Sequence, residues 1–173
     1  MGFYRATRIP MTAGKNPGPR AYDFSDQPER QKLEDFLESN RPSTSHSRLT
    51  SWFACDKPGK SARYLDAEIT FKPNTANTGE PLLFVVEMTS PSKQPMILVN
   101  AIRERLAAGD TAAAELLACE YWQASREWRF WEYTSPEIVV VEQLPWPDTI
   151  EQSLASLSYQ ADAKTLMQMY NCR

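Results

Sequence analysis

Short strand signals and helix signals are intermixed along this chain of 173 residues, without the regular strand–helix alternation of a parallel sheet. Strand character is expected at residues 3–9, 48–55, 64–72, 82–88, 129–133 and 137–144. Apolar residues at helical spacing predict helices at 25–40, 95–108, 111–122 and 149–170. The pattern therefore predicts an α+β domain with a largely antiparallel or mixed sheet.

Proline, glycine and capping residues set the predicted boundaries. Ser25 is the expected N-cap of the first helix, and Pro42 cannot continue that helix beyond about Asn40. Gly109 separates the two central helices. Residues 10–19 and 73–81 are rich in turn-forming residues and are expected to be loops.

Composition indicates one globular domain covering residues 1–173. Apolar residues make up 42% of the chain and charged residues 24%, a balance typical of a protein that folds around a core. The net charge of −3 gives no support to duplex binding through phosphates, which needs a basic excess. This acidic total still leaves room for a local basic pocket.

Several familiar chemistries are excluded by the absence of their residues. One histidine, His46, and three dispersed cysteines are too few for a zinc site, so no metal is expected. The GxGxxG, GxxxxGK[ST] and GxSxG patterns are absent. What remains is chemistry that needs a carboxylate, an arginine and hydroxyl groups.

The chain carries no stretch near the roughly 20 apolar residues that span a bilayer, and its first residues lack the apolar core of a signal peptide. We therefore expect no membrane partner. The expected location is the cytoplasm, or the cytoplasm of a target cell reached through a specialised secretion system.

Two segments offer groups for binding a phosphorylated, ring-containing ligand. Arg5, on the first predicted strand, has planar donors that match two phosphate oxygens, or it is a surface arginine on an edge strand. In the second segment the hydroxyls of Ser47 and Ser51 precede Trp52 and Phe53, which can stack on a flat ring. The plainer interpretation of the second segment is a Ser/Thr-rich loop followed by core aromatics.

The third segment holds a glutamate among large aromatics. Alternation places Phe130 and Glu132 on one strand face and Trp131 and Tyr133 on the other. Partial burial would raise the pKa of Glu132 unless donors meet it, which suits a functional carboxylate. A solvent-facing strand position is the alternative.

In their order, these segments resemble the ADP-ribosyltransferase superfamily, and most of all its small bacterial and phage domains. The resemblance extends from the N-terminus to about Leu144, and its matching pieces are Phe3-Tyr4-Arg5, Leu33-Glu34, Ser47-Arg48, Trp52-Phe53, Tyr121-Trp122 and Trp131-Glu132. It implies mixed or antiparallel sheets with flanking helices, and NAD as the substrate.

The resemblance also implies roles for individual residues. Glu132 would be catalytic, and the NAD-binding set would be Arg5, Ser47, Arg48, Ser51, Trp52 and Phe53. Two departures stand out. Phe130 occupies the position of the first glutamate in the E-x-E pair of arginine-modifying members, and Glu137 is a rival for the catalytic glutamate.

The implied function is mono-ADP-ribosylation of a macromolecular target, protein or nucleic acid, by a toxin, effector or host-modifying enzyme that an immunity protein could inhibit. An NAD glycohydrolase on the same fold is one alternative. A non-catalytic binding module (immunity protein, antitoxin or adaptor) is another, and it would expose Trp128, Trp131 and Tyr133 with Glu132 in solvent. A cleft joining Arg5, Ser47 and Glu132 would favour the enzyme.

Overall fold

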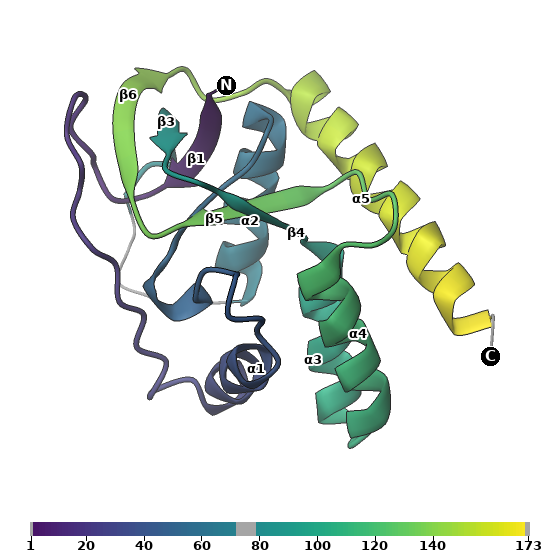
Figure 1. Cartoon of the computed structure of the whole chain (residues 1–173). Helices are drawn as coiled ribbons and strands as arrows, with labels where there is room; N and C mark the ends of the chain where they lie inside the picture. The colour runs from purple at the N-terminus through teal and green to yellow at the C-terminus, as the bar shows by residue number, and fades with distance from the viewer. Residues whose placement is uncertain (1, 72–78, 172–173) are drawn as a thin grey trace.

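The computed structural model describes residues 2–71 and 79–171. These residues form two three-stranded antiparallel sheets with helices around them, which confirms the predicted α+β class (Figure 1). The strands are β1 (Phe3–Thr7), β2 (Trp52–Ala54), β3 (Leu82–Met88), β4 (Ser92–Pro95), β5 (Trp131–Ser135) and β6 (Ile138–Leu144). The helices are α1 (Pro28–Ser39), the short 3₁₀ helix η1 (Arg48–Thr50), α2 (Pro58–Phe71), α3 (Ile97–Ala107), α4 (Thr111–Gln123) and α5 (Thr149–Asn171).

The two sheets meet at a fork. One sheet has the order β1-β3-β6 and the other β2-β5-β4, so β1 and β2 are edge strands. A single bridge joins these edges, because Tyr4 and Cys55 exchange two backbone hydrogen bonds of 2.8 Å. Beyond this bridge the strands separate, and the backbone N–H of Ala6 instead donates to Ser61 Oγ of α2 at 2.6 Å. The fork therefore leaves a space between β1 and β2.

Apolar faces of both sheets share a core beside the fork. Phe3, Trp52 and Phe84 are buried in one cluster, and the ring of Phe3 lies 4.8 Å from that of Tyr133. A second, larger cluster joins α1, α3 and α4, with Leu37, Leu98, Ile102 and Tyr121 almost completely buried. Figure 1 shows α3 and α4 side by side on the far side of β4 and β5 from β6.

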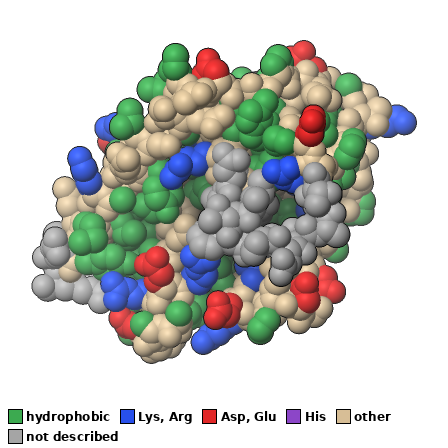
Figure 2. Space-filling view, turned by 180° about the vertical axis from the view of Figure 1, so that it is seen from behind, with side chains coloured by type: hydrophobic (Ala, Val, Ile, Leu, Met, Phe, Trp, Pro, Cys, Tyr) green, Lys and Arg blue, Asp and Glu red, His purple; other side chains and the backbone are tan. Residues whose placement is uncertain are grey.

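The outer surface carries mixed chemistry. Seen from behind, acidic and basic side chains are interspersed with hydrophobic ones (Figure 2). Among residues 2–71 and 79–171, no helix combines the length and apolar character needed to cross a bilayer.

The strand expected at residues 64–72 is wrong where the structure describes it, because α2 (Pro58–Phe71) is a helix. Proline is well suited to the first helical position, and the buried Ala62 and Leu65 are spaced for one helical face. The predicted loop at 73–81 lies mostly outside the described residues, as does position 72.

Two boundaries and one strand also differ from the expectations. Only Trp52–Ala54 of the predicted strand at 48–55 is extended, since η1 occupies its beginning. Gln27, without a side-chain cap, precedes α1 in place of Ser25, whose backbone N–H donates to Asp23 in a local turn. The short, polar β4 was not predicted. The other helices and strands agree with the expectations to within a few residues.

Gly59 lets α2 approach α5 closely. A Cβ atom at this buried position would lie 2.7 Å from the carbonyl carbon of Glu151, and that backbone cannot turn aside as a flexible side chain can. We expect Gly59→Ala to lower the free energy of unfolding by about 1–3 kcal/mol, measured by denaturant titration. Lys57→Ala, at an exposed neighbouring position, serves as the control and should change stability little. Equal stability of Gly59→Ala and wild type would contradict the close approach.

Candidate functional site

Arg48 lies at the centre of a buried charge cluster. Its guanidinium is 1% exposed, and Nε donates to Glu34 Oε2 at 2.8 Å. Nη1 donates both to Glu132 Oε1 and to the hydroxyl of Tyr121. The cluster thus connects η1 with α1, α4 and β5, and each carboxylate has a positive partner inside the protein.

Local hydrogen bonds fix the backbone that carries Arg48. The Ser47 hydroxyl accepts from the N–H of Leu49 at 3.2 Å and caps η1. The N–H of Arg48 itself donates to Glu38 Oε1 of α1 at 2.7 Å. The guanidinium also lies 4.9 Å from the centre of the Phe53 ring. These contacts hold the charge in one position.

The cluster shifts the acidity of its members. Burial opposes the charge of Glu34, but Arg48 and Arg30 more than offset this, so the pKa of Glu34 lies below its usual value. Burial and the neighbouring Glu132 hold the pKa of Tyr121 well above its usual value despite Arg48, so the phenol stays neutral and donates. Its hydroxyl lies 2.5 Å from Glu132 Oε1.

Glu132 is held by one oxygen only. Oε1 accepts from Arg48 and Tyr121, whereas Oε2 is buried and has no hydrogen-bond partner within residues 2–71 and 79–171. The side chain is 1% exposed, while Trp131 and Tyr133 are partly exposed, so the alternation holds over the first three residues of β5. Phe130 is also buried, but it precedes the strand and does not share its face.

Arg5 spans the fork between β1 and β2. Its Nη1 donates to the Phe53 carbonyl at 2.7 Å, and its guanidinium lies 5.0 Å from the centre of the Trp52 ring. Nε is buried and has no hydrogen-bond partner in the part of the chain that the structure describes. Arg5, Trp52 and Phe53, which the resemblance assigns to NAD binding, thus lie together.

A cavity of about 170 Å³ lies beside this arginine. Its lining includes Arg5, Phe53, Arg20, Tyr22 and Tyr64. Two hydrogen bonds hold the segment 18–22 across this side of the fork: Trp52 Nε1 donates to Gly18 O at 3.0 Å, and the N–H of Tyr22 donates to Leu49 O at 2.9 Å. Neither Ser47 nor Glu132 lines this cavity.

Cys55, the residue after β2, is a buried thiol. Burial raises its pKa, and the charges of Glu132 and Asp56 raise it further, while Lys60 and Arg5 lower it. The hydroxyl of Ser51, directly before β2, is also buried, and no described residue forms a hydrogen bond with it. The rival carboxylate, Glu137, lies exposed between β5 and β6.

Sequence reasoning did not assign roles to Glu34, Tyr121 or Arg20. Glu34 and Tyr121 were recognised only as parts of matching pieces, and their contacts with Arg48 depend on the packing of helices far apart in sequence. Arg20 directly follows the predicted loop at residues 10–19, and its guanidinium lies 4.4 Å from the centre of the Tyr22 ring.

Chemically, the structure offers an anchored carboxylate, Glu132, and an arginine beside aromatic rings, Arg5, but Glu132 does not line the cavity beside Arg5. An arginine of this kind can pair with phosphate oxygens, and a fixed carboxylate can stabilise positive charge. Within the described residues no group of three or more histidine, cysteine, aspartate or glutamate side chains is arranged to hold a metal ion. Neither a scan against protein-family models nor a search of curated proteins found a match to the chain.

The Glu34–Arg48 pair predicts how stability depends on pH. Because the folded pKa of Glu34 is lowered, its contribution is present above the unfolded value near 4.5 and is lost as the pH falls through the folded pKa. We expect Glu34→Gln to lower the free energy of unfolding at pH 7 by about 3 kcal/mol. The difference from wild type should shrink below about pH 4.5.

Denaturant titrations at several pH values measure this difference. Glu29→Gln, at an exposed position in the first turn of the same helix, is the matched control and should stay close to wild type at each pH. A Glu34→Gln deficit that stays constant down to pH 3, or no deficit at all, would contradict the ion pair.

Proposed function

We propose that this protein is an NAD-dependent mono-ADP-ribosyltransferase with an ADP-ribosyltransferase-like fold. One observation carries the proposal. Among the described residues, three buried side-chain atoms lack a hydrogen-bond partner: Arg5 Nε, Ser51 Oγ and Glu132 Oε2. These atoms belong to the arginine, the hydroxyl and the glutamate to which the resemblance assigns NAD binding and catalysis. Each unpaired buried group costs roughly 1–3 kcal/mol, which a bound ligand would recover.

Glu132 would supply the catalytic charge. Breaking the bond between nicotinamide and ribose develops positive charge on the sugar, as in the transition state of glycoside hydrolysis. Arg48 and Tyr121 hold Oε1, which leaves Oε2 free to accept a hydrogen bond from the ribose 2′-hydroxyl. A carboxylate fixed in a dry site needs little reorganisation as that charge grows, so it favours the transition state over the substrate.

Arg5 would bind the phosphate-bearing part of NAD. Its guanidinium already neighbours the Trp52 ring and retains a free N–H, so it can pair with a phosphate oxygen without leaving its position. Phe53, whose ring lies near Arg48 and Tyr22, is suited to contact the nicotinamide or adenine ring. Ser47, which caps η1, would act by holding Arg48 in place.

Binding of NAD in this site requires the segment 18–24 to move. The cavity beside Arg5 is only about 170 Å³, whereas small-molecule sites usually measure roughly 300–1,000 Å³. The segment is held by the Trp52–Gly18 and Tyr22–Leu49 hydrogen bonds and by the packing of Phe24, which is 5% exposed. We propose that NAD displaces these contacts and reaches Ser51 and Glu132.

Two alternatives differ in what they require. A non-catalytic binding module was expected to expose Trp128, Trp131 and Tyr133 with Glu132 in solvent; Trp128 is 5% exposed and Glu132 1%, whereas Trp131 and Tyr133 are partly exposed. The cleft joining Arg5, Ser47 and Glu132 that would favour the enzyme is not formed by the cavity beside Arg5, which neither Ser47 nor Glu132 lines. An NAD glycohydrolase would use the same residues, with water as the acceptor. Measuring the rate of nicotinamide release with and without a cell lysate, which supplies macromolecular acceptors, distinguishes this hydrolase from a transferase.

The first test replaces Glu132. We expect Glu132→Gln to lower the rate of nicotinamide release from NAD by at least about a hundredfold, because the amide keeps the shape but removes the charge. Release is measured with purified protein, with and without lysate, and the fold is checked by circular dichroism. Growth of the wild-type rate with lysate would identify a transferase, and a rate independent of lysate would identify the hydrolase.

Glu137→Gln is the matched control. Glu137 lies exposed five residues away, and its removal should leave nicotinamide release unchanged. Loss of activity in Glu137→Gln with full activity in Glu132→Gln would move the catalytic role to Glu137. No release by the wild-type protein under any condition would contradict the enzyme.

A further inference from the structure

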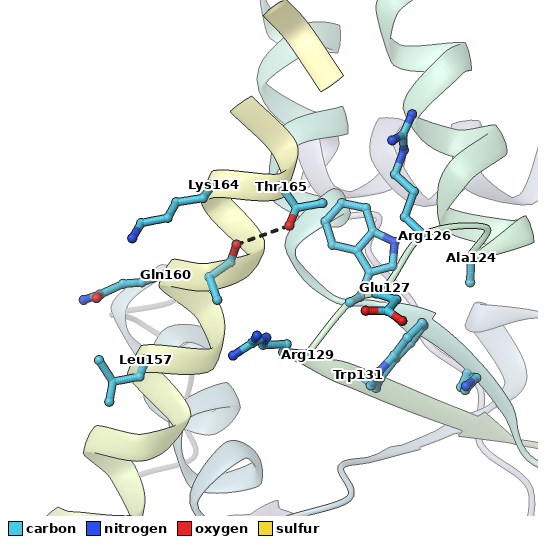
Figure 3. A pocket seen from close by; sticks show the side chains of 12 residues that line it. Ala124, Arg126, Glu127, Arg129, Trp131, Leu157, Gln160, Lys164 and Thr165 are labelled. Atoms are coloured by element: carbon cyan, nitrogen blue, oxygen red, sulfur yellow. Dashed lines mark hydrogen bonds between the residues drawn. The ribbon is translucent and has the colours of Figure 1, made fainter. Parts of the chain in front are cut away.

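A second, larger concavity lies apart from the fork. It is a groove of about 1100 Å³ between α5 and the segment 124–130, which joins α4 to β5 (Figure 3). In Figure 3 Thr165 points from α5 toward the connecting segment and Arg129 points from that segment toward α5, whereas Gln160 and Lys164 extend from the other side of α5 and Arg126 points away from Arg129. None of the residues assigned to NAD lines this groove.

The lining of the groove is basic although the chain is acidic overall, while two buried carboxylates, Glu120 and Asp162, lie behind its connecting segment. Its lining includes one carboxylate, Glu127, against the four cations Lys93, Arg126, Arg129 and Lys164. All four cations are exposed, and none of them forms a salt bridge in the part of the chain that the structure describes. An excess of unpaired positive charge along one groove attracts an anion that carries several charges.

Two buried carboxylates hold the segment that presents the arginines. Glu120, at the end of α4, accepts hydrogen bonds from the Ser125 hydroxyl, the N–H of Arg126 at 3.1 Å and Trp128 Nε1 at 2.9 Å. Glu120 is 8% exposed, so its charge is satisfied by these donors and not by water alone.

Asp162 of α5 holds the other end of the segment. Its two oxygens accept from the N–H groups of Arg129 at 2.8 Å and Phe130 at 2.7 Å, and the side chain is 1% exposed. The backbone of the connecting segment is therefore fixed at both ends while the guanidinium groups remain exposed. Such preorganisation lowers the entropy lost when a ligand binds.

Trp131 adds a flat aromatic surface to the groove. Its ring is partly exposed, and Lys93 Nζ lies 4.5 Å from the ring centre. A ring with cations around it is the combination that proteins use to stack a base while they neutralise the adjoining phosphates. A peptide with acidic side chains would use the cations but gain nothing specific from this ring.

We propose that this groove binds single-stranded nucleic acid. Its volume exceeds the roughly 300–1,000 Å³ of ordinary small-molecule sites, which suits a segment of a polymer. A single strand fits better than a duplex because its bases are free to stack on Trp131. This proposal stands on the groove alone and does not depend on the cleavage of NAD.

Fluorescence anisotropy measures the affinity of the full chain for a labelled single-stranded oligonucleotide, and so tests whether the groove binds nucleic acid. The oligonucleotide has about 16 nucleotides, the upper site size of a single-strand-binding domain. Neutralisation of phosphates by four cations predicts a slope of about −2.8 for the logarithm of the association constant against that of salt concentration. The double variant Arg126→Ala/Arg129→Ala should weaken binding at least tenfold at low salt and reduce the slope to about −1.4.

Two comparisons test the specific parts of the proposal. Lys32→Ala/Lys57→Ala removes two exposed cations outside the groove and should leave affinity and slope unchanged. An abasic strand of equal length should bind the wild-type protein about tenfold more weakly with the same slope, because it keeps the phosphates and loses the stacking. The Trp131→Leu variant should bind the abasic strand and the intact strand with equal affinity, because it lacks the ring on which bases would stack.

Several results would overturn the proposal. They are the absence of binding at low salt, equal weakening by the two double variants, and equal affinity for the abasic and intact strands. Competition by polyglutamate as effective as that by the oligonucleotide would also overturn it and assign the groove to an acidic protein partner.

Discussion

The rest of the site depends on the burial of Arg48 between Glu34 and Glu132. A guanidinium that is 1% exposed requires compensation, and the protein supplies it with two carboxylates and the Tyr121 hydroxyl. Removal of one partner from such a pair costs roughly 3–5 kcal/mol, because the remaining charge stays buried. The arrangement therefore fixes α1, α4 and β5 relative to one another, and with them the carboxylate proposed to be catalytic.

The fork between the sheets is the second constraint. Because β1 and β2 share only the Tyr4–Cys55 bridge, backbone groups on the edges of both strands beyond the bridge need other partners. The side chain of Arg5 donates to the carbonyl of Phe53, and the hydroxyl of Ser61 accepts from the N–H of Ala6. A continuous six-stranded sheet would satisfy these groups by strand pairing and would close the space. The fork thus brings the Arg5 guanidinium to the edge of β2, beside the Trp52 ring and the carbonyl of Phe53.

Much of the fold could be predicted because many elements have a clear apolar period. Leu82–Met88, Thr111–Gln123 and Thr149–Asn171 agree closely with the expected ranges. The segment 58–71 could not be assigned in this way, because its apolar residues fit a strand from residue 64 while the helix begins six residues earlier at Pro58. The four-residue β4 forms because β5 offers it a partner, which is a tertiary effect.

The site was predictable only in part. Alternation placed Glu132 on the opposite strand face from Trp131 and Tyr133 but left open which face is buried, and Arg5, Trp52 and Phe53 were already grouped by the resemblance. The partners of Arg48 could not be derived, since they lie 14, 73 and 84 residues away in sequence and meet only through helix packing. The basic groove likewise joins residues of β4, the 124–130 segment and α5, whose charges are dispersed along the chain.

The most direct test of the account is calorimetric titration of NAD onto Glu132→Gln, which separates binding from cleavage. The account predicts binding at one site per chain, weakened at least tenfold when Arg5→Ala is added, because a charge-assisted contact to phosphate is lost. Absence of binding by a Glu132→Gln protein whose circular dichroism matches that of wild type, or binding that Arg5→Ala leaves unchanged, would contradict the claim that the fork between β1 and β2 is the NAD site.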